Sequence, residues 1–290
     1  MILLTGATGP TGSHVLKHMV AAGLKVRAFV QREASVHAAL AAGAVETIRG
    51  DLHSPADVVR ALEGIEQVYF IAPRFLDTEV AITRGMIEAA RTAGVGHFIY
   101  HSVYHAQLDA ILHHRDKRIC EAALFDSLLP YTVLQPTMYM QSTTRDWRDI
   151  VQAGRYAVPY STEQRMTVVD LEDVGAAAAV VAGTTDFRGG CYELASGEQL
   201  SRAQMASVMT DVLGRPVNAV RSDLAAWQAH QRSVGVLTEA QIERMSVMMR
   251  HYDEAGMGGG NGRVFGMILG RAPHRYRDHI EAMAKLRPQG

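Results

Sequence analysis

The sequence predicts an α/β protein built on a doubly wound parallel sheet, with a smaller and mostly helical C-terminal lobe. Short β-branched or aromatic runs alternate with longer helical patterns through residues 1–136, as in repeated βαβ units. The first runs are almost wholly apolar, as in parallel strands covered by helices on both faces. Right-handed crossovers would then wind these units into one Rossmann-type sheet.

The strand-like runs fix the order of the expected elements. They lie at 2–6, 26–30, 45–50, 67–72, 97–102 and 131–136, and each of the first five is followed by a helical pattern. The first helix should span about residues 11–22. Ser54 and Pro55 are typical of an N-cap and a first helical residue, and Gly64 stands just past the end of that helix.

The pattern becomes less regular after about residue 153. Two short strands are expected at 155–160 and 166–170, then a helix from Asp170, a strand near 191–195, and mostly helices to the end. We expect a core domain at 1–153, to which parts of 166–195 return, and a second lobe at 154–290.

Three glycines follow the first strand at three-residue intervals, in the stretch ILLTGATGPTG. In a strand–turn–helix unit, Gly6 permits a tight turn, Gly9 lets backbone N–H groups approach a pyrophosphate, and Gly12 permits close packing of the helix. Thr8 and Thr11 stand in the same turn and are expected contacts. The N-terminus of the helix adds a positive partial charge. The core domain is therefore predicted to bind a dinucleotide.

The end of the second strand favours NADP(H) over NAD(H). An acidic residue there would bind the ribose 2′-hydroxyl, and a basic one a 2′-phosphate. This chain has uncharged Gln31 followed by Arg32, whose guanidinium can grip a phosphate, although Glu33 keeps NAD(H) open. After the third strand, Asp51 and Leu52 are expected beside the adenine, with a plain turn role for Asp51 as the alternative.

Composition excludes several function classes. With 29 Lys and Arg against 30 Asp and Glu, the formal net charge is −1, so no nucleic-acid partner is expected. The longest apolar stretch, 174–183, is too short to cross a membrane. The two cysteines, Cys120 and Cys191, lie far apart and lack metal-ligand spacing, which fits a reducing compartment. We expect a cytoplasmic protein.

Several segments together resemble the NmrA-like family of atypical short-chain dehydrogenases. They are GATGPTG, VRAFVQR, RGDL, VYFIAP and YTVLQPTMYMQ, and the similarity runs over nearly the whole chain. The resemblance implies a nicotinamide cofactor. It leaves the activity open, because the family includes NAD(P)H-dependent reductases as well as proteins that bind the dinucleotide without known turnover.

The catalytic question concerns residues 101–117. Typical short-chain dehydrogenases use a Tyr-x-x-x-Lys pair, in which the lysine lowers the phenol pKa and holds the nicotinamide ribose. Here the spacing is His113-x-x-x-Lys117, so the usual tyrosine is missing. We expect Lys117 to contact the cofactor and, as the resemblance implies, to act as general acid or base. His113 either takes the tyrosine's role or, like His114, lies on an exposed helix face. Tyr104 and Ser102 are candidate donors to an oxyanion.

No metal site is expected. A site built from the histidines of residues 101–117 would need a helical His-x-x-x-His pair or a companion carboxylate motif, and this segment has neither.

The exit of the sixth strand should form one wall of a substrate pocket over the nicotinamide. Pro136 there, and Ala72 at the end of the fourth strand, are expected cofactor contacts. Methionines in 244–252 and in the glycine-rich stretch 256–262 can line the same pocket, although methionines at helical spacing often belong to the core. The glycine-rich stretch is either a loop that closes the site or a flexible turn.

Two functions follow. The first is an NAD(P)H-dependent oxidoreductase that delivers hydride to a small apolar or aromatic acceptor, such as a carbonyl or a quinone. The second is a redox sensor that binds NADP(H), turns over little, and engages another protein. The C-terminal lobe, with its apolar pocket, favours the enzyme, and the missing tyrosine favours the sensor.

Overall fold

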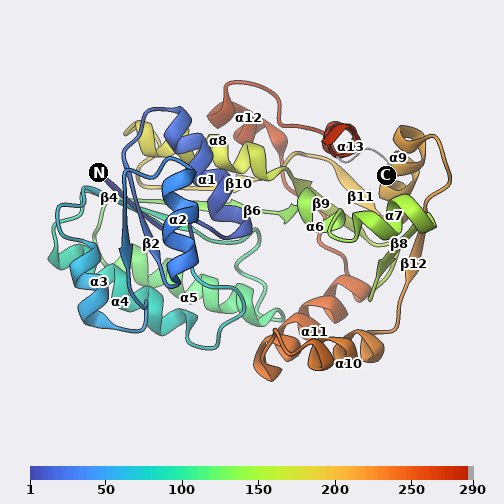
Figure 1. The fold of residues 1–290 in the computed structure, drawn as a ribbon, viewed down its shortest axis with the longest axis horizontal. Helices are drawn as coiled ribbons and strands as arrows, with labels where there is room; N and C mark the ends of the chain where they lie inside the picture. Colours follow the sequence, from blue (N-terminus) through green and yellow to red (C-terminus); the bar gives the residue numbers. More distant parts are fainter. Residues whose placement is uncertain (287–290) are drawn as a thin grey trace.

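The computed structural model, which describes residues 1–286, has a seven-stranded sheet as its main element (Figure 1). The strand order is β10-β6-β5-β4-β1-β2-β3, and every pairing is parallel. The strands are β1 (Ile2–Thr5), β2 (Val26–Val30), β3 (Glu46–Arg49), β4 (Gln67–Phe70), β5 (His97–His101), β6 (Tyr131–Pro136) and β10 (Gly190–Leu194). The predicted doubly wound sheet is confirmed, and its direction of winding reverses between β1 and β4.

Helices cover both faces of this sheet, which explains the apolar strands. Four helices share a buried apolar cluster on one face: α1 (Pro10–Ala21), α2 (Glu33–Ala41), α8 (Leu171–Gly183) and α12 (Gly262–Leu269). Three helices pack on the other face: α3 (Pro55–Ala61), α4 (Glu79–Thr92) and α5 (Leu112–Asp126). Ser54 caps α3 by accepting from the Asp57 N–H, and Pro55 is the first helical residue, as predicted.

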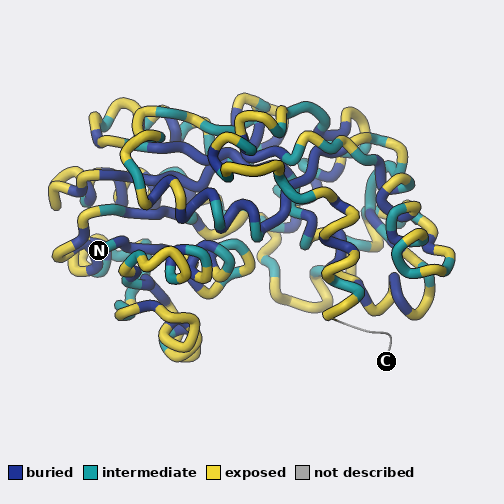
Figure 2. The backbone as a smooth tube through the Cα atoms, turned by 90° about the horizontal axis from the view of Figure 1, so that it is seen from above, coloured by how far each residue is buried: buried dark blue, intermediate teal, exposed yellow. Residues whose placement is uncertain are grey.

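The smaller lobe has an apolar cluster of its own, formed mainly by α7 (Trp147–Ala153), α9 (Arg202–Leu213) and α13 (Tyr276–Leu286). Its strands are β7 (Met138–Tyr139), β9 (Arg165–Val169) and β11 (Gln199–Ser201) in one sheet, and β8 (Arg155–Val158) with β12 (Asn218–Arg221) in another. The remaining helices are α6 (Met140–Thr143), α10 (Leu224–Val234) and α11 (Glu239–Glu254). Figure 2 shows buried backbone continuing from the larger part into this lobe, with exposed residues at the outer turns.

The chain crosses between the two parts more than once. After β9, it returns to the main sheet as α8, which packs against α1, and as the edge strand β10. Helix α12 also packs on the main core, although its residues fall within the predicted lobe. The short strands β7, β11 and β12 were not predicted; β7 and β11 have only two and three residues, which give too little alternation to be seen in a sequence. The division into 1–153 and 154–290 remains our proposal.

The glycine turn after β1 has the tight geometry that its spacing indicates. Gly6 has a φ of +66°, in the left-handed region. A Cβ on Gly12 would lie 2.0 Å from the carbonyl oxygen of Gly6, so α1 can pack this closely only with glycine there. A Cβ on Gly9 would meet only that same oxygen within 4 Å, at 3.2 Å, and would otherwise face open space. Gly6 and Gly12 therefore shape the turn, and Gly9 leaves room beside it.

No helix within residues 1–286 is long and apolar enough to cross a membrane.

The close approach at Gly12 predicts a position-specific cost. Gly12→Ala should lower the free energy of unfolding by about 1–3 kcal/mol, because backbone atoms must move to admit the methyl group. The matched control is Gly85→Ala in α4, where a Cβ meets nothing within 4 Å and which should stabilise the protein by about 0.4–1 kcal/mol. Urea unfolding of both variants measures the difference, and a neutral Gly12→Ala would contradict the packing described here.

Candidate functional site

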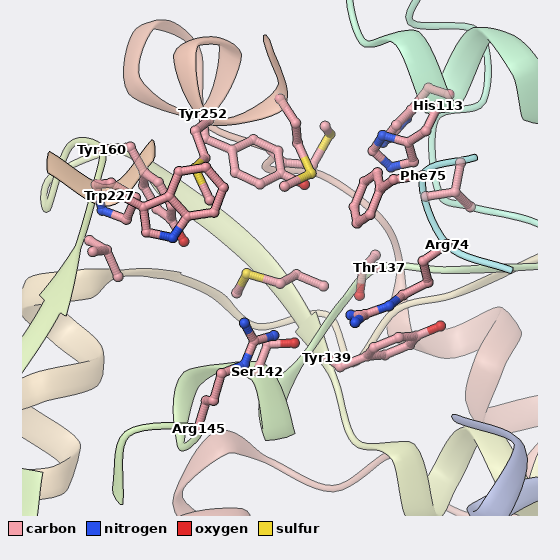
Figure 3. A pocket seen from close by; sticks show the side chains of 18 of the residues that line it. Arg74, Phe75, His113, Thr137, Tyr139, Ser142, Arg145, Tyr160, Trp227 and Tyr252 are labelled. Atoms are coloured by element: carbon pink, nitrogen blue, oxygen red, sulfur yellow. The ribbon is translucent and has the colours of Figure 1, made fainter. Parts of the chain in front are cut away.

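A cavity of about 850 Å³ lies at the carboxyl edge of the main sheet, where the sheet meets the smaller lobe. Its walls come from the first turn of α1, the loop after β4, the ends of β5 and β6, helix α5, and the lobe helices α10 and α11. In Figure 3, His113, Phe75 and Arg74 lie on one side of it, and Tyr160, Trp227 and Tyr252 on the opposite side. The cavity therefore joins the predicted cofactor edge to the lobe.

Lys117 enters the cavity wall from α5 and is held by a buried ion pair. Its Nζ lies 2.8 Å from Oε1 of Glu79, and the two side chains are 12% and 2% exposed. The ammonium also donates to the carbonyl oxygen of His101 at 2.9 Å and lies over the Tyr100 ring, 4.8 Å from its centroid. Two of its three hydrogens are thus committed, and one is left for a ligand.

His113 also lines the cavity, one helical turn before Lys117. Its ring meets the Phe75 ring edge-on, with centroids 4.8 Å apart. Burial, with the neighbouring His114 and Lys117, lowers the pKa of His113 well below its usual value. His114 is buried, and its Nδ1–H donates to the His105 carbonyl oxygen. Neither histidine lies on an exposed helix face, so that alternative is wrong, and His113 is a neutral wall residue.

The two candidate oxyanion donors lie at the cavity but have other partners. Ser102 is buried and donates its hydroxyl hydrogen to Glu121, which leaves it no hydrogen for an oxyanion. Tyr104 is buried and stacks on His105, and a Cβ on Gly259 would lie 2.6 Å from its hydroxyl oxygen. The expected donor role of Ser102 therefore needs correction, and the Tyr104 hydroxyl faces the glycine-rich stretch.

Hydrogen bonds hold that glycine-rich stretch, residues 256–262, against the lobe. The Met257 N–H donates to the Arg165 carbonyl, and the Thr167 N–H donates to the Met257 carbonyl, both at 2.9 Å. The Thr167 hydroxyl donates to the Gly259 carbonyl. In this structure the stretch is a packed wall, and Met257 lines the cavity together with Met248 and Met249 of α11.

The predicted cofactor residues form a continuous line along the sheet edge. Thr11, Ala72, Pro136 and Lys117 line the cavity itself. Gly6, Thr8, Gly9 and Gly12 form the adjoining turn and the start of α1. Gln31 and Arg32 follow β2 and are exposed, with Arg32 at the N-cap of α2.

Asp51 is engaged in a local turn. Its carboxylate accepts from the His53 N–H at 3.0 Å and lies 2.9 Å from His53 Nδ1, and these contacts lower the Asp51 pKa. Leu52 next to it packs partly against the α3–α5 side of the core. The contact of both residues with the adenine stays a prediction. The structure shows Asp51 in the turn role that was its alternative.

Sequence reasoning missed a buried hydrogen-bonded chain under the cavity floor. The Tyr69 hydroxyl lies 3.0 Å from His101 Nδ1, and His101 Nε2 lies 2.8 Å from the Tyr139 hydroxyl. Burial, aided by the charge on Lys117, lowers the pKa of His101 to about 3, and burial raises that of Tyr139 to about 12. All three groups are therefore neutral near pH 7. Their sequence signal was polar side chains in β4, at the end of β5 and in the short strand β7 that follows β6.

Within residues 1–286, no group of three or more His, Cys, Asp or Glu side chains is arranged to hold a metal ion.

The comparison with known proteins fits this geometry. The model of the NmrA-like family matches residues 1–275. The chain belongs to the NmrA-like family. This member is 29% identical over 242 residues to the NAD(P)H azoreductase of Xenophilus azovorans, across 81% of each chain. It is 27% identical over 238 residues to quinone oxidoreductase 2 of Escherichia coli (strain K12), across 81% of this chain and 82% of that one.

Two solved structures share the fold of this NmrA-like chain. One is an NADPH-dependent quinone oxidoreductase from Escherichia coli complexed with NADPH, with a TM-score of 0.84, 23% identity, and 98% and 99% of the two chains covered. The other is the Citrobacter sp. triphenylmethane reductase complexed with NADP(H), with a TM-score of 0.84, 20% identity, and 98% and 100% covered. At these identities, the likeness establishes the fold.

The buried pair of Lys117 and Glu79 predicts a large effect on stability. Glu79→Gln should lower the free energy of unfolding by about 3–5 kcal/mol, because it leaves the Lys117 ammonium buried without a counter-charge. Glu88→Gln is the control on the same helix, since Glu88 pairs with Arg91 at the exposed surface and its loss should change stability far less. Adding Lys117→Met to Glu79→Gln should recover part of the loss. Equal costs for the two single variants would contradict the burial of this pair.

Proposed function

We propose that this chain is an NAD(P)H-dependent oxidoreductase that delivers hydride to a quinone, a dye or another small conjugated acceptor. The observation that carries the proposal is that one continuous cavity of about 850 Å³ is lined both by Thr11 at the start of α1 and by aromatic side chains of the lobe. A dinucleotide at the sheet edge and an acceptor in the lobe would meet inside it. The azoreductase and the quinone oxidoreductase among the relatives support this activity.

The residues present fit a dinucleotide. The space beside Gly9, where a Cβ would meet only one atom within 4 Å, leaves room for a pyrophosphate at the N-terminus of α1. In this proposal the turn Gly6–Gly12, with Thr8 and Thr11, holds the pyrophosphate, Asp51 and Leu52 flank the adenine, and Ala72, Pro136 and Lys117 contact the nicotinamide half. The reduced nicotinamide, when bound, supplies the hydride.

The groups around Lys117 determine how the chain handles the proton. Glu79 and the His101 carbonyl fix the ammonium, so that its remaining hydrogen can bind the ribose or reach the reacting oxygen. In our proposal Lys117 gives a proton to the reduced acceptor and recovers one from water in the cavity. His113, which is neutral, shapes the wall beside it and does not supply a charge.

The acceptor half of the cavity favours an apolar or aromatic guest. Phe75, Met248, Met249, Trp227 and Tyr252 all line it. Methionine side chains adapt to guests of different shapes, and aromatic rings stack on flat ones. We infer a small aromatic acceptor, with no nucleic-acid or membrane partner, for a protein of the cytoplasm.

The proposal includes a preference for NADPH. Arg32 is exposed and has no ion-pair partner among residues 1–286, so its guanidinium is available for a 2′-phosphate. Glu33, the residue that kept NADH open, pairs with Arg49 at 3.0 Å. Its negative charge is thus partly neutralised by a second arginine close to the same strand end.

The second candidate, an NADP(H)-binding sensor without significant turnover, is favoured by one observation. Ser102 donates to Glu121, Lys117 is paired with Glu79, and His113 is neutral, so the conventional donors near the nicotinamide edge are committed or uncharged. A sensor would bind the dinucleotide and change its conformation or its protein partner without reducing an acceptor.

Cofactor preference is tested by calorimetric titration with NADPH and NADH. The parent protein should bind NADPH more tightly, and Arg32→Ala should weaken NADPH binding about 10- to 100-fold, the worth of a charged hydrogen bond, while leaving NADH unchanged. Lys25→Ala, which removes an exposed charge from the opposite end of β2, should leave both affinities unchanged. Equal affinity of the parent for both cofactors would show that Arg32 has been misassigned.

The activity is tested by aerobic and anaerobic oxidation of NADPH over a panel of quinones, azo dyes, aldehydes and imines. If an acceptor is reduced, Lys117→Ala should lower its kcat by about 10²- to 10⁴-fold, with a much smaller change in NADPH affinity. His113→Phe should cost far less. A kcat of Lys117→Ala within about threefold of the parent would refute the role of the lysine. A protein that binds NADPH, changes its protease sensitivity and reduces nothing would be the sensor.

A further inference from the structure

The smaller lobe contains a buried cation that the mechanism above does not use. Arg202, the first residue of α9, is 1% exposed. Its Nη1 donates to the Tyr156 hydroxyl at 2.9 Å, and its Nη2 to the Tyr160 hydroxyl at 2.5 Å. The sulfur atoms of Met138 and Met205 lie 2.8 and 3.2 Å from the same two nitrogens. No carboxylate among residues 1–286 forms an ion pair with it.

These partners accept from Nη1 and Nη2, whereas the buried Nε of Arg202 has no hydrogen-bond partner within residues 1–286, and the charge is left uncompensated. Burial raises the pKa of Tyr156 to about 12, so this phenol is neutral near pH 7, and thioethers carry no charge. A buried charge without a counter-charge costs several kcal/mol. The hydrogen bonds of Arg202 link α9 to β7 and β8. A neutral side chain could make such links without the cost of burying a charge. The hydrogen bonds alone therefore do not explain why a charged side chain is buried here.

The charge lies directly behind one wall of the cavity. Two of its four partners, Tyr160 and Met138, line the cavity, whereas Tyr156 and Met205 do not. Tyr160 accepts from Arg202, and its own hydrogen is donated to no residue within 1–286. Its ring meets that of Tyr252 edge-on, with centroids 5.7 Å apart, and Trp227 lies beside them (Figure 3). Tyr160 thus offers a donor at the aromatic end of the cavity.

We propose that Tyr160, backed by the buried charge of Arg202, donates a hydrogen bond to an oxygen atom of the acceptor and stabilises the negative charge that develops there. The inference rests on the proposed oxidoreductase function and names its substrate class: a quinone or similar conjugated carbonyl that places an oxygen at the aromatic end of the cavity.

The electron balance explains why such a donor would help. A quinone that takes a hydride from NAD(P)H on one carbonyl oxygen forms an O–H bond there and gains two electrons, and the displaced π electrons move through the ring to the other carbonyl oxygen, which becomes negative. The product is a hydroquinone anion, and the dinucleotide leaves as NAD(P)⁺. A donor next to a fixed positive charge in a water-poor wall stabilises that anion more than the neutral quinone, which is the requirement for faster chemistry. A proton from Lys117, which recovers one from water, then completes the hydroquinone.

The chain offers a matched pair of variants. Tyr160→Phe removes the Arg202-bound hydroxyl of a residue that lines the cavity, and Tyr156→Phe removes the Arg202-bound hydroxyl of a residue that does not line it. For a naphthoquinone, Tyr160→Phe should lower kcat/KM by about 10- to 100-fold, the worth of a hydrogen bond to a charged group, with unchanged NADPH affinity. Tyr156→Phe should stay within about threefold. For a triphenylmethane dye without oxygen atoms, both variants should stay within about threefold.

If no acceptor is reduced, the proposed function fails. A binding measurement then still tests the role of Tyr160. Titration of an anionic hydroxynaphthoquinone, followed by tryptophan fluorescence, should show affinity weakened at least about tenfold in Tyr160→Phe and unchanged in Tyr156→Phe. Equal affinities in the two variants, or equal losses on quinone and dye in a working enzyme, would overturn the role of Tyr160.

Discussion

The candidate site depends on the buried ion pair between Lys117 and Glu79. It joins α5 to the start of α4, and through the His101 carbonyl it also joins both helices to the end of β5. An ammonium this deeply buried needs its carboxylate, and the carboxylate in turn fixes the direction from which the lysine faces the cavity. One remaining hydrogen on Nζ is therefore presented at a defined point on the sheet edge. The neutral His113 and the internally bonded Ser102 surround it.

In typical short-chain dehydrogenases a single tyrosine both transfers the proton and stabilises the negative charge on the acceptor. In this arrangement the two tasks fall to different residues. The lysine is positioned beside the predicted nicotinamide, but no phenol stands one turn before it. Tyrosine hydroxyls are present elsewhere in the cavity wall. Tyr139 is bonded to the neutral His101 at the sheet edge, and Tyr160 is bonded to Arg202 in the lobe. Since Arg202 carries an uncompensated charge, the lobe can stabilise negative charge on an acceptor without a proton being transferred at the same moment.

The features that sequence reasoning found are those fixed by local geometry. Gly6 and Gly12 were predictable because a tight turn and a close helix approach each require glycine at one position, and the apolar strands were predictable because parallel strands are covered on both faces. Glu79 was missed because its partner lies 38 residues away in the sequence, and a lone glutamate at a helix start is ordinary. Ser102 was misjudged for the same reason, since Glu121 reaches it from α5. The burial of His113 and Arg202 depends on residues distant in the sequence, such as Phe75 beside His113 and Tyr156 beside Arg202, which no local pattern records.

Hydride transfer within the cavity is the central claim, and a single-turnover experiment tests it most directly. Protein loaded with NADPH is mixed anaerobically with a naphthoquinone in a stopped-flow instrument, and the nicotinamide absorbance and the hydroquinone formed are followed together. The account predicts that one hydroquinone appears for each NADPH consumed, at a single rate that falls when the transferred hydrogen of the nicotinamide is deuterium. An unchanged nicotinamide absorbance without hydroquinone, while NADPH remains bound, would contradict the account. A rate equal to that of NADPH and quinone without the protein would contradict it as well.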